Sequence, residues 1–234
     1  MTEVSPQRSR RRDPGRYQDI LDIFTRNVAR RGYAASNFSE IANELGISKG
    51  TIVHHYGTKD RLFAQMHDTY MQRRLDEAKD IVGAFESPAE RLAGLLLAWM
   101  LYQQIDRDST IAYQREVATL ATNDSLARGR TLRADYLALV RDVLNDGMNV
   151  GQFRKLDTKV QSLLMFGSSQ WAWTWFDPEG ELTAIEAAAQ LVQLGLGSLL
   201  IDRLSLDSIA DPQGPVATAV QAILDRHARA RQNT

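Results

Sequence analysis

Residues Phe38–Phe63 read FSEIANELGISKGTIVHHYGTKDRLF, and this stretch decides the fold of the first part of the chain. Apolar residues recur there at the 3.6-residue period of an amphipathic helix: Phe38, Ile41, Ala42 and Leu45. Either Ser36 or Asn37 can cap the start of this helix. Gly46 follows it, where a left-handed residue ends a helix and only glycine enters that conformation without a steric cost. The pattern predicts a short helix that stops at Gly46.

A second short helix follows the Gly46 corner. Ser48 is placed to cap it, and Ile52 and Tyr56 supply its buried side. The residues that packing does not need are polar, which is typical of a helix-turn-helix whose second helix enters a DNA major groove. An ordinary helical corner with no DNA role is the alternative. The predicted DNA-contacting residues are Ser48, Lys49, Gly50, Thr51, Val53, His54, His55 and Lys59.

These residues have different expected roles. Lys49 stands at a helix N-terminus, where the helix dipole already favours a phosphate, and Lys59 is placed for the flanking DNA backbone. Thr51 and the two histidines can hydrogen-bond base edges or phosphate oxygens. His54 and His55 are consecutive, so they diverge by about 100° on a helix and do not form a metal-binding pair. The sequence predicts no metal site and no cofactor.

The stretch resembles the N-terminal signature of TetR-family transcriptional regulators. The resemblance is carried by Gly32-Tyr33, Ile41-Ala42, Gly46-Ile47-Ser48-Lys49-Gly50-Thr51, His54-His55-Tyr56, Lys59 and Leu62-Phe63. It covers residues 16–65 closely and the rest of the chain by length and helical pattern. Family members usually have an aromatic residue at the position of Val53, which puts that particular DNA contact in doubt. The resemblance implies a homodimer that binds a palindromic double-stranded operator.

Composition limits the remaining possibilities. Residues 1–60 contain ten Lys and Arg against seven Asp and Glu, which gives this part a net formal charge of +3. Since the whole chain has a formal charge of −1, the remaining residues carry −4. A basic end on an acidic body suits a protein that binds DNA with one end. The chain has no cysteine, no apolar run long enough to span a membrane and no apolar signal-peptide core, which predicts a cytoplasmic protein. Catalytic motifs such as G-x-S-x-G or a P-loop are missing, so we expect no enzyme.

The periodicity predicts an all-α chain of four parts: a basic disordered arm (1–15), a three-helix DNA-binding domain (16–60), a helical ligand-binding and dimerisation domain (61–206) and a C-terminal tail (207–234). A long helix over 58–85 would join head and body. Further helices are expected at 89–106, 109–121, 124–150, 156–176 and 182–204, with a polar helix at 216–231. Small and apolar residues in 156–176 and 182–204 predict a four-helix dimer seam.

An aromatic cluster in the body has two interpretations, as filling of the core or dimer seam or as the wall of an effector cavity. The resemblance implies that an apolar body cavity takes a small ligand whose binding separates the two heads. The predicted cavity residues are Trp99, Tyr102, Gln103, Tyr113, Glu116, Leu120, Met148, Phe166, Gln170, Trp171 and Trp173.

The body also resembles, more distantly, acyl-CoA-responsive regulators of lipid and sterol-ring catabolism. The shared features are Tyr113-Gln114-Arg115-Glu116, the Gly147–Phe153 turn and Trp175-Phe176-Asp177-Pro178. The sequence therefore predicts a ligand-responsive dimeric repressor, released by a small hydrophobic effector or, more narrowly, an acyl-CoA. The alternative is a ligand-independent architectural or division-control protein on the same fold.

Overall fold

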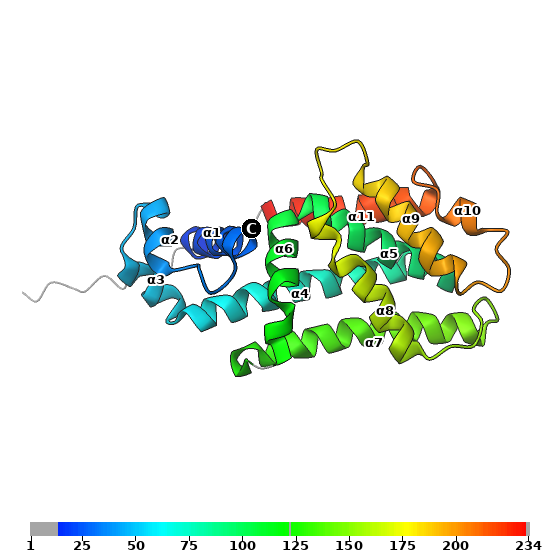
Figure 1. Ribbon diagram of the computed structural model, residues 1–234, viewed down its shortest axis with the longest axis horizontal. Coiled ribbons are helices and arrows are strands. Elements are labelled where there is room, and N and C mark those ends of the chain that lie inside the picture. The colour runs from blue at the N-terminus through cyan, green and yellow to red at the C-terminus, as the bar shows by residue number, and fades with distance from the viewer. Residues whose placement is uncertain (1–13, 122, 233–234) are drawn as a thin grey trace, which may run out of the picture.

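The computed structural model describes residues 14–121 and 123–232 as a helical head joined to a larger helical body (Figure 1). The predicted arm, residues 1–15, lies outside the described residues except for Pro14 and Gly15. No β-strand occurs in the described part of the chain, which confirms the all-α class. The helices are α1 Pro14–Arg31, α2 Phe38–Leu45, α3 Lys49–Tyr56, α4 Lys59–Gly83, α5 Pro88–Ile105, α6 Arg107–Glu116, α7 Ala127–Asn149, α8 Thr158–Gln170, α9 Ala184–Gly197, α10 Leu206–Ile209 and α11 Pro215–Gln232.

Local side-chain bonds set the ends of the head helices. Asn37, rather than Ser36, caps α2 by accepting a hydrogen bond from the Glu40 N–H at 3.1 Å. Gly46 adopts the left-handed conformation (φ 62°, ψ 34°) between α2 and α3. Ser48 caps α3 by accepting from the Thr51 N–H at 3.1 Å. The predicted helix-turn-helix is therefore present. Its helices begin and end where predicted because short-range hydrogen bonds and the left-handed Gly46 set their ends.

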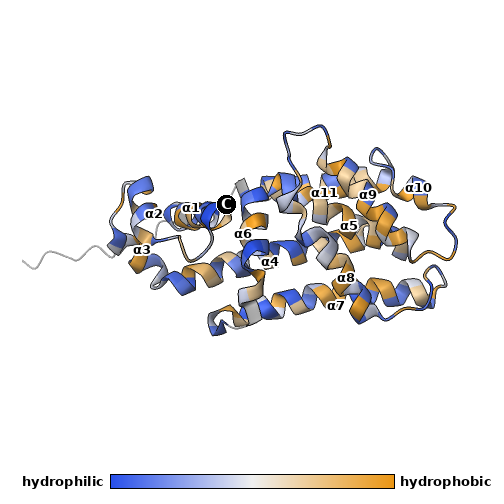
Figure 2. Ribbon diagram, in the orientation of Figure 1, coloured by the Kyte–Doolittle hydropathy of each residue, from blue (hydrophilic) through white to orange (hydrophobic). Residues whose placement is uncertain are grey.

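Helix α5 is the centre of the body. Its residues are buried around the whole helix from Leu92 to Gln103, as expected of a helix that is apolar on most sides. It packs against α4, α7, α9 and α11, and the hydropathy colouring shows α5 and α9 as the most apolar helices (Figure 2). Helix α5 begins at Pro88, directly after its N-cap residue Ser87. Proline is tolerated in the first turn because the N–H groups there have no partner within the helix. None of the described helices is long and apolar enough to cross a membrane.

Two predicted helices are shorter than expected. The helix predicted over 156–176 ends at Gln170, and residues 172–174 form a single 3₁₀ turn. Ser168 and Ser169 donate their hydroxyls to carbonyls three residues earlier, and such local bonds compete with helix propagation. The helix predicted over 182–204 ends at Gly197, after which Leu200 forms an isolated bridge with Phe153.

Helix α11 belongs to the body core. The chain after residue 206 was predicted as a tail with a polar helix, but α11 buries an apolar face against α4 and α5. Val220 lies 3.3 Å from the position where a Cβ on Gly94 of α5 would stand, so the two helices touch closely. The buried residues of α11 are Val216, Ala217, Val220, Ile223 and Leu224.

Candidate functional site

Helix α3 presents a polar surface at the end of the head. Ile52 and Tyr56 are buried below it, and the Tyr56 hydroxyl donates to the backbone oxygen of Tyr17 at 2.8 Å. Lys49, Gly50 and His54 are exposed, and Thr51 and His55 are partly exposed. Val53 is 45% exposed, so its apolar side chain is accessible to a binding partner of the head. The geometry is that of a recognition helix held rigidly from below.

The two remaining predicted head residues already have partners within the protein. Ser48 shares a hydrogen bond with the Thr51 hydroxyl at 3.0 Å, in addition to capping α3. Lys59 lies 4.2 Å above the Tyr33 ring and donates to the Ala34 carbonyl at 3.3 Å. An ammonium group has three donors, so Lys59 retains capacity for a phosphate while it also fixes the loop before α2. No group of three metal-ligating side chains occurs among the described residues.

Head and body are joined directly through α6. The Tyr33 N–H donates to Oε1 of Glu116 at 2.8 Å, and Nη1 of Arg115 donates to the Ala29 carbonyl at 3.1 Å. Gly32 has a positive φ of 83°, and a Cβ there would lie 3.3 Å from the same Glu116 oxygen. The C-terminal end of α6 therefore contacts the end of α1 and the turn that follows it.

The body contains a small internal pocket, which we call the body pocket. It lies between five helices, α4 to α8, and only about 20 Å³ of it is open to the centre of a water molecule, roughly the room that one water needs. Its walls are mainly aromatic, with a T-shaped contact of 5.4 Å between Trp99 and Phe166. The lining residues are Tyr70, Met71, Arg74, Trp99, Tyr102, Gln114, Tyr136, Phe166, Ser169 and Gln170.

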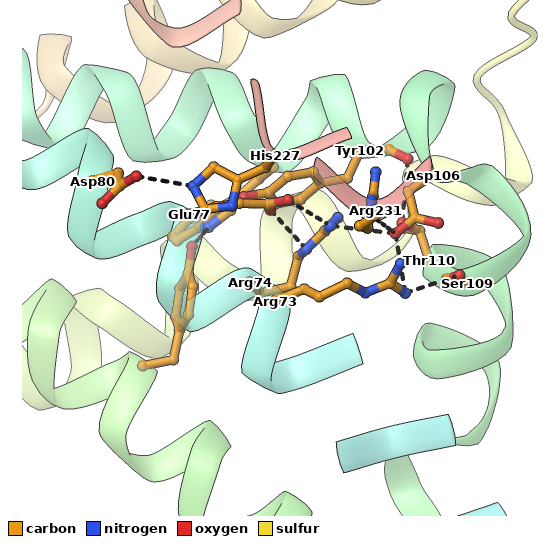
Figure 3. A network of polar contacts seen from close by, with 12 residues as sticks. Arg73, Arg74, Glu77, Asp80, Tyr102, Asp106, Ser109, Thr110, His227 and Arg231 are labelled. Carbon is orange, nitrogen blue, oxygen red and sulfur yellow. Dashed lines mark hydrogen bonds and ion pairs between the residues drawn. The ribbon is translucent and has the colours of Figure 1, made fainter. Parts of the chain in front are cut away.

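One side of the body pocket is a buried ionic network (Figure 3). Arg74 is 3% exposed, pairs with Glu77 at 3.0 Å and with Asp106 at 3.2 Å, and stacks 3.8 Å from the Tyr102 ring centroid. Asp106 also forms ion pairs with Arg73 at 3.3 Å and with Arg231 of α11 at 3.4 Å. The network links α4, α5, the start of α6 and α11.

The network favours the charged forms of Arg74 and Asp106. Burial disfavours the charged form of Arg74, but Tyr102, Glu77 and Asp106 together outweigh burial and raise its pKa above the usual value. Burial likewise opposes ionisation of Asp106, yet the neighbouring Arg74 and Arg73 hold the pKa of that carboxyl below its usual range. Arg74 is therefore a permanent buried cation at the pocket wall.

The predicted cavity residues lie in several places. Trp99, Tyr102, Phe166 and Gln170 line the body pocket. Gln103 and Tyr113 form a second layer, Gln103 donating to Gln114 at 3.2 Å and Tyr113 stacking on Tyr70 at 4.6 Å. The others are away from the pocket lining: Glu116 is at the head junction, Met148 near the end of α7, Trp171 is 68% exposed, and Trp173 lies 5.7 Å from the Arg115 guanidinium. The side chain of Leu120 lies outside the described residues.

Sequence reasoning missed the α4 wall of the pocket. Arg74 lies in a row with the apolar residues Met66, Tyr70 and Ala78, each four residues from the next, so its position on the helix faces the core. A charged residue inside such a row is the signal that identifies a buried ionic site.

Helix α8 exposes a continuous apolar stripe. Val160, Leu163, Leu164 and Trp171 are 51%, 44%, 64% and 68% exposed, at the spacing of one helix face. Nothing lies within 4 Å of a Cβ placed on Gly167, which falls on the same stripe. Leu194 on α9 is 68% exposed as well. Apolar surface of this extent marks an interaction site.

The helix-turn-helix head on a pocketed helical body defines a DNA-binding transcription regulator. Residues 20–66 match the family described as "Bacterial regulatory proteins, tetR family", and residues 86–199 match "Tetracyclin repressor-like, C-terminal domain". The chain belongs to the TetR family. Helix α11 lies beyond both matched ranges.

Relatives and solved structures agree with this assignment. The chain is 26% identical over 182 residues to the transcriptional repressor KstR2 of Mycobacterium tuberculosis, covering 77% of this chain and 91% of the relative. The structure of the ketosteroid regulator KstR2 from that organism has a TM-score of 0.74 at 25% identity, covering 82% and 98%. AibR, solved with isovaleryl coenzyme A and operator DNA, has a TM-score of 0.69 at 25% identity, covering 76% and 97%. The KstR2 proteins are named as transcriptional regulators.

Proposed function

We propose that the protein is a homodimeric transcriptional repressor that binds a palindromic operator through α3 and leaves it when a small, largely apolar effector enters the body pocket. The observation that carries this proposal is the position of the pocket. Its walls include α4, which continues from α3, and α6, which touches α1. A molecule that fills the pocket would therefore press on helices that are attached to the head.

Operator binding rests on the exposed surface of α3. Lys49 and Gly50 at its start are suited to phosphate contact, and Thr51 and His54 to base edges or phosphate oxygens. In a two-fold dimer the two α3 helices would enter successive major grooves about 34–36 Å apart, which requires an inverted-repeat operator.

Dimerisation rests on the α8 stripe. Pairing α8 and α9 with the same helices of a second copy would cover Leu163, Leu164 and Leu194, and Gly167 would allow close approach of the two α8 helices. A two-fold interface of this kind brings each residue against the equivalent surface of its partner.

Effector release requires the small pocket to expand. With room for about one water, the pocket fits a ligand only when side chains such as Met71 and Phe166 move. The ligand would then favour a conformation in which α4 and α6 are displaced, and the DNA-binding population would fall in proportion to the difference in affinity. Relatives support an acyl-CoA as the narrower class of effector, since AibR was solved with isovaleryl coenzyme A.

The small open volume favours one alternative, a ligand-independent DNA-binding protein on the same fold. Its body would be a filled core, with Arg74 and Asp106 serving only to fix helix packing.

A mobility-shift assay with DNA from upstream of the protein's own coding region separates the two functions. The repressor is expected to shift this DNA, and at least one of a panel of fatty acids, aromatic acids, sterol-ring compounds and acyl-CoAs should abolish the shift. A shift that is unchanged by the whole panel contradicts effector release and supports the ligand-independent alternative.

A further inference from the structure

The body pocket has a polar side whose hydrogen-bonding capacity is only partly used within the protein. Three residues that line it keep a buried polar atom with no hydrogen-bond partner in the described part of the chain. These atoms are Nη1 of Arg74, the hydroxyl of Tyr102 and Oε1 of Gln170. Leaving such atoms unpaired costs free energy, so each of them is available to a polar group that enters the pocket.

The charge of the surrounding network determines which polar group fits. Its ion pairs join three cations, Arg73, Arg74 and Arg231, to two anions, Glu77 and Asp106. The network therefore carries one formal positive charge in excess. Glu77 and Asp106 do not line the body pocket, whereas Arg74 does. A ligand in the pocket meets the cation directly and the carboxylates only behind it.

We infer that the body pocket selects a compact apolar molecule that ends in a free carboxylate, bound by the guanidinium of Arg74 and the hydroxyl of Tyr102. The apolar part of this ligand would lie against Trp99, Tyr136 and Phe166. The inference rests on the proposed function and specifies the chemical class of its effector.

A carboxylate fits these partners better than the thioester suggested by the relatives. The unused Nη1 of Arg74 can donate a strong charge-assisted hydrogen bond to a carboxylate, and the Tyr102 hydroxyl adds a second donor atom. The amide of Gln170 can turn to donate its N–H₂ group, because the two ends of an amide are nearly equivalent in shape. A thioester or methyl ester offers a neutral carbonyl oxygen and leaves the excess positive charge unbalanced.

The test is isothermal titration calorimetry of the full-length protein with benzoate, 4-phenylbutyrate and decanoate. Each acid is compared with its methyl ester and with its CoA thioester. We expect at least one acid to bind roughly ten-fold or more tightly than its ester and thioester, since hydrogen bonds to charged groups are the strong ones. An ester or thioester that binds as tightly as its acid, or no binding by any of the three acids, would overturn the inference.

Variants locate the effect at the polar side of the pocket. Tyr102→Phe removes one hydroxyl with little change of shape and should weaken acid binding about ten-fold while leaving the ester unchanged. Arg74→Lys keeps the charge but loses the planar fork, and should also reduce the preference for acid over ester. Tyr113→Phe is the matched control, a buried tyrosine that stacks on Tyr70 but does not line the pocket. Should Arg74→Lys fail to fold, Tyr102→Phe decides alone, and an unchanged acid preference in it would contradict the inference.

The same titrations, repeated with operator DNA bound, distinguish this inference from the proposed function. Acid binding that does not release the DNA would support the carboxylate site and contradict effector release. DNA release by the thioester alone would support effector release and overturn the carboxylate site.

Discussion

Glu116 of the body accepts a hydrogen bond from the backbone N–H of Tyr33 in the head, at 2.8 Å, across 83 positions of sequence. The bond sits two residues after Gln114, which lines the body pocket on the same helix. Helix α6 therefore reaches from the pocket to the head. This relationship gives the pocket a physical route to α1 that is separate from the covalent route through α4.

Replacing Glu116 with Ala should lower the free energy of unfolding by about 1–3 kcal/mol, because a charged acceptor is lost and a partly buried N–H is left unpaired. Urea denaturation measures this. Glu44→Ala is the matched control: it removes a carboxylate from the exposed Arg26–Glu44 pair and should cost less than about 1 kcal/mol. Equal losses from the two variants would contradict a structural bond at the head junction.

Lys49→Ala should weaken binding to all DNA sequences and reduce the slope of log affinity against log salt by about one unit, because one phosphate contact is lost. Lys59→Ala should do the same and also lower the melting temperature, since Lys59 holds the Tyr33 ring and the Ala34 carbonyl. Fluorescence anisotropy at several salt concentrations gives the slopes.

Thr51→Ala or His54→Ala should instead change the preference for particular bases, by about 1–3 kcal/mol at the contacted position. Competition binding with single-base operator variants measures this preference. A uniform loss on specific and random DNA would show that the affected residue contacts only the DNA backbone.

Leu164→Asp should convert the proposed dimer to monomers, because it places a charge in the centre of the α8 stripe. Sedimentation velocity gives the oligomeric state. Leu204→Asp is the control, since Leu204 is 92% exposed but lies beyond α9, outside the stripe. A dimer that survives Leu164→Asp would exclude α8 as the interface.

Acidification should destabilise the protein through His67. This side chain is fully buried between Phe63 and Tyr113, and burial lowers its pKa from 6.5 to about 4. Between these values the unfolded state binds the proton and the folded state does not, so stability falls as the pH drops. The loss from pH 7 to pH 5 should be about 2 kcal/mol.

Urea denaturation at the two pH values tests this assignment to His67. His67→Phe should remove most of the pH dependence, whereas His54→Gln on the exposed face of α3 should retain it. An undiminished dependence in His67→Phe would assign the effect to other groups.

Local sequence signals were sufficient for the head. Its helix ends depend on the capping residues Asn37, Ser48 and Thr58 and on the left-handed Gly46, each of which acts over three or four residues. The break at Pro88 was predictable for the same reason.

The body pocket could be predicted only in part, because it depends on how five helices pack. The α5 and α8 residues were found from their aromatic character. Arg74 was missed although its place in the apolar row of α4 is visible in the sequence, because its partners Tyr102 and Asp106 lie in a later part of the chain. Glu116 was misplaced because its partner is 83 residues away. The role of α11 was missed because its apolar face is diluted by Arg and Gln residues along the same helix.

Sequence-specific DNA binding by a dimer through α3 is tested by selecting binding sites from a random pool of duplex DNA and footprinting them. We expect an enriched inverted repeat whose half-sites are centred about one helical turn apart, protected by the wild-type protein and only weakly by Lys49→Ala. Recovery of no enriched sequence, or of an asymmetric site protected equally by both proteins, would contradict it.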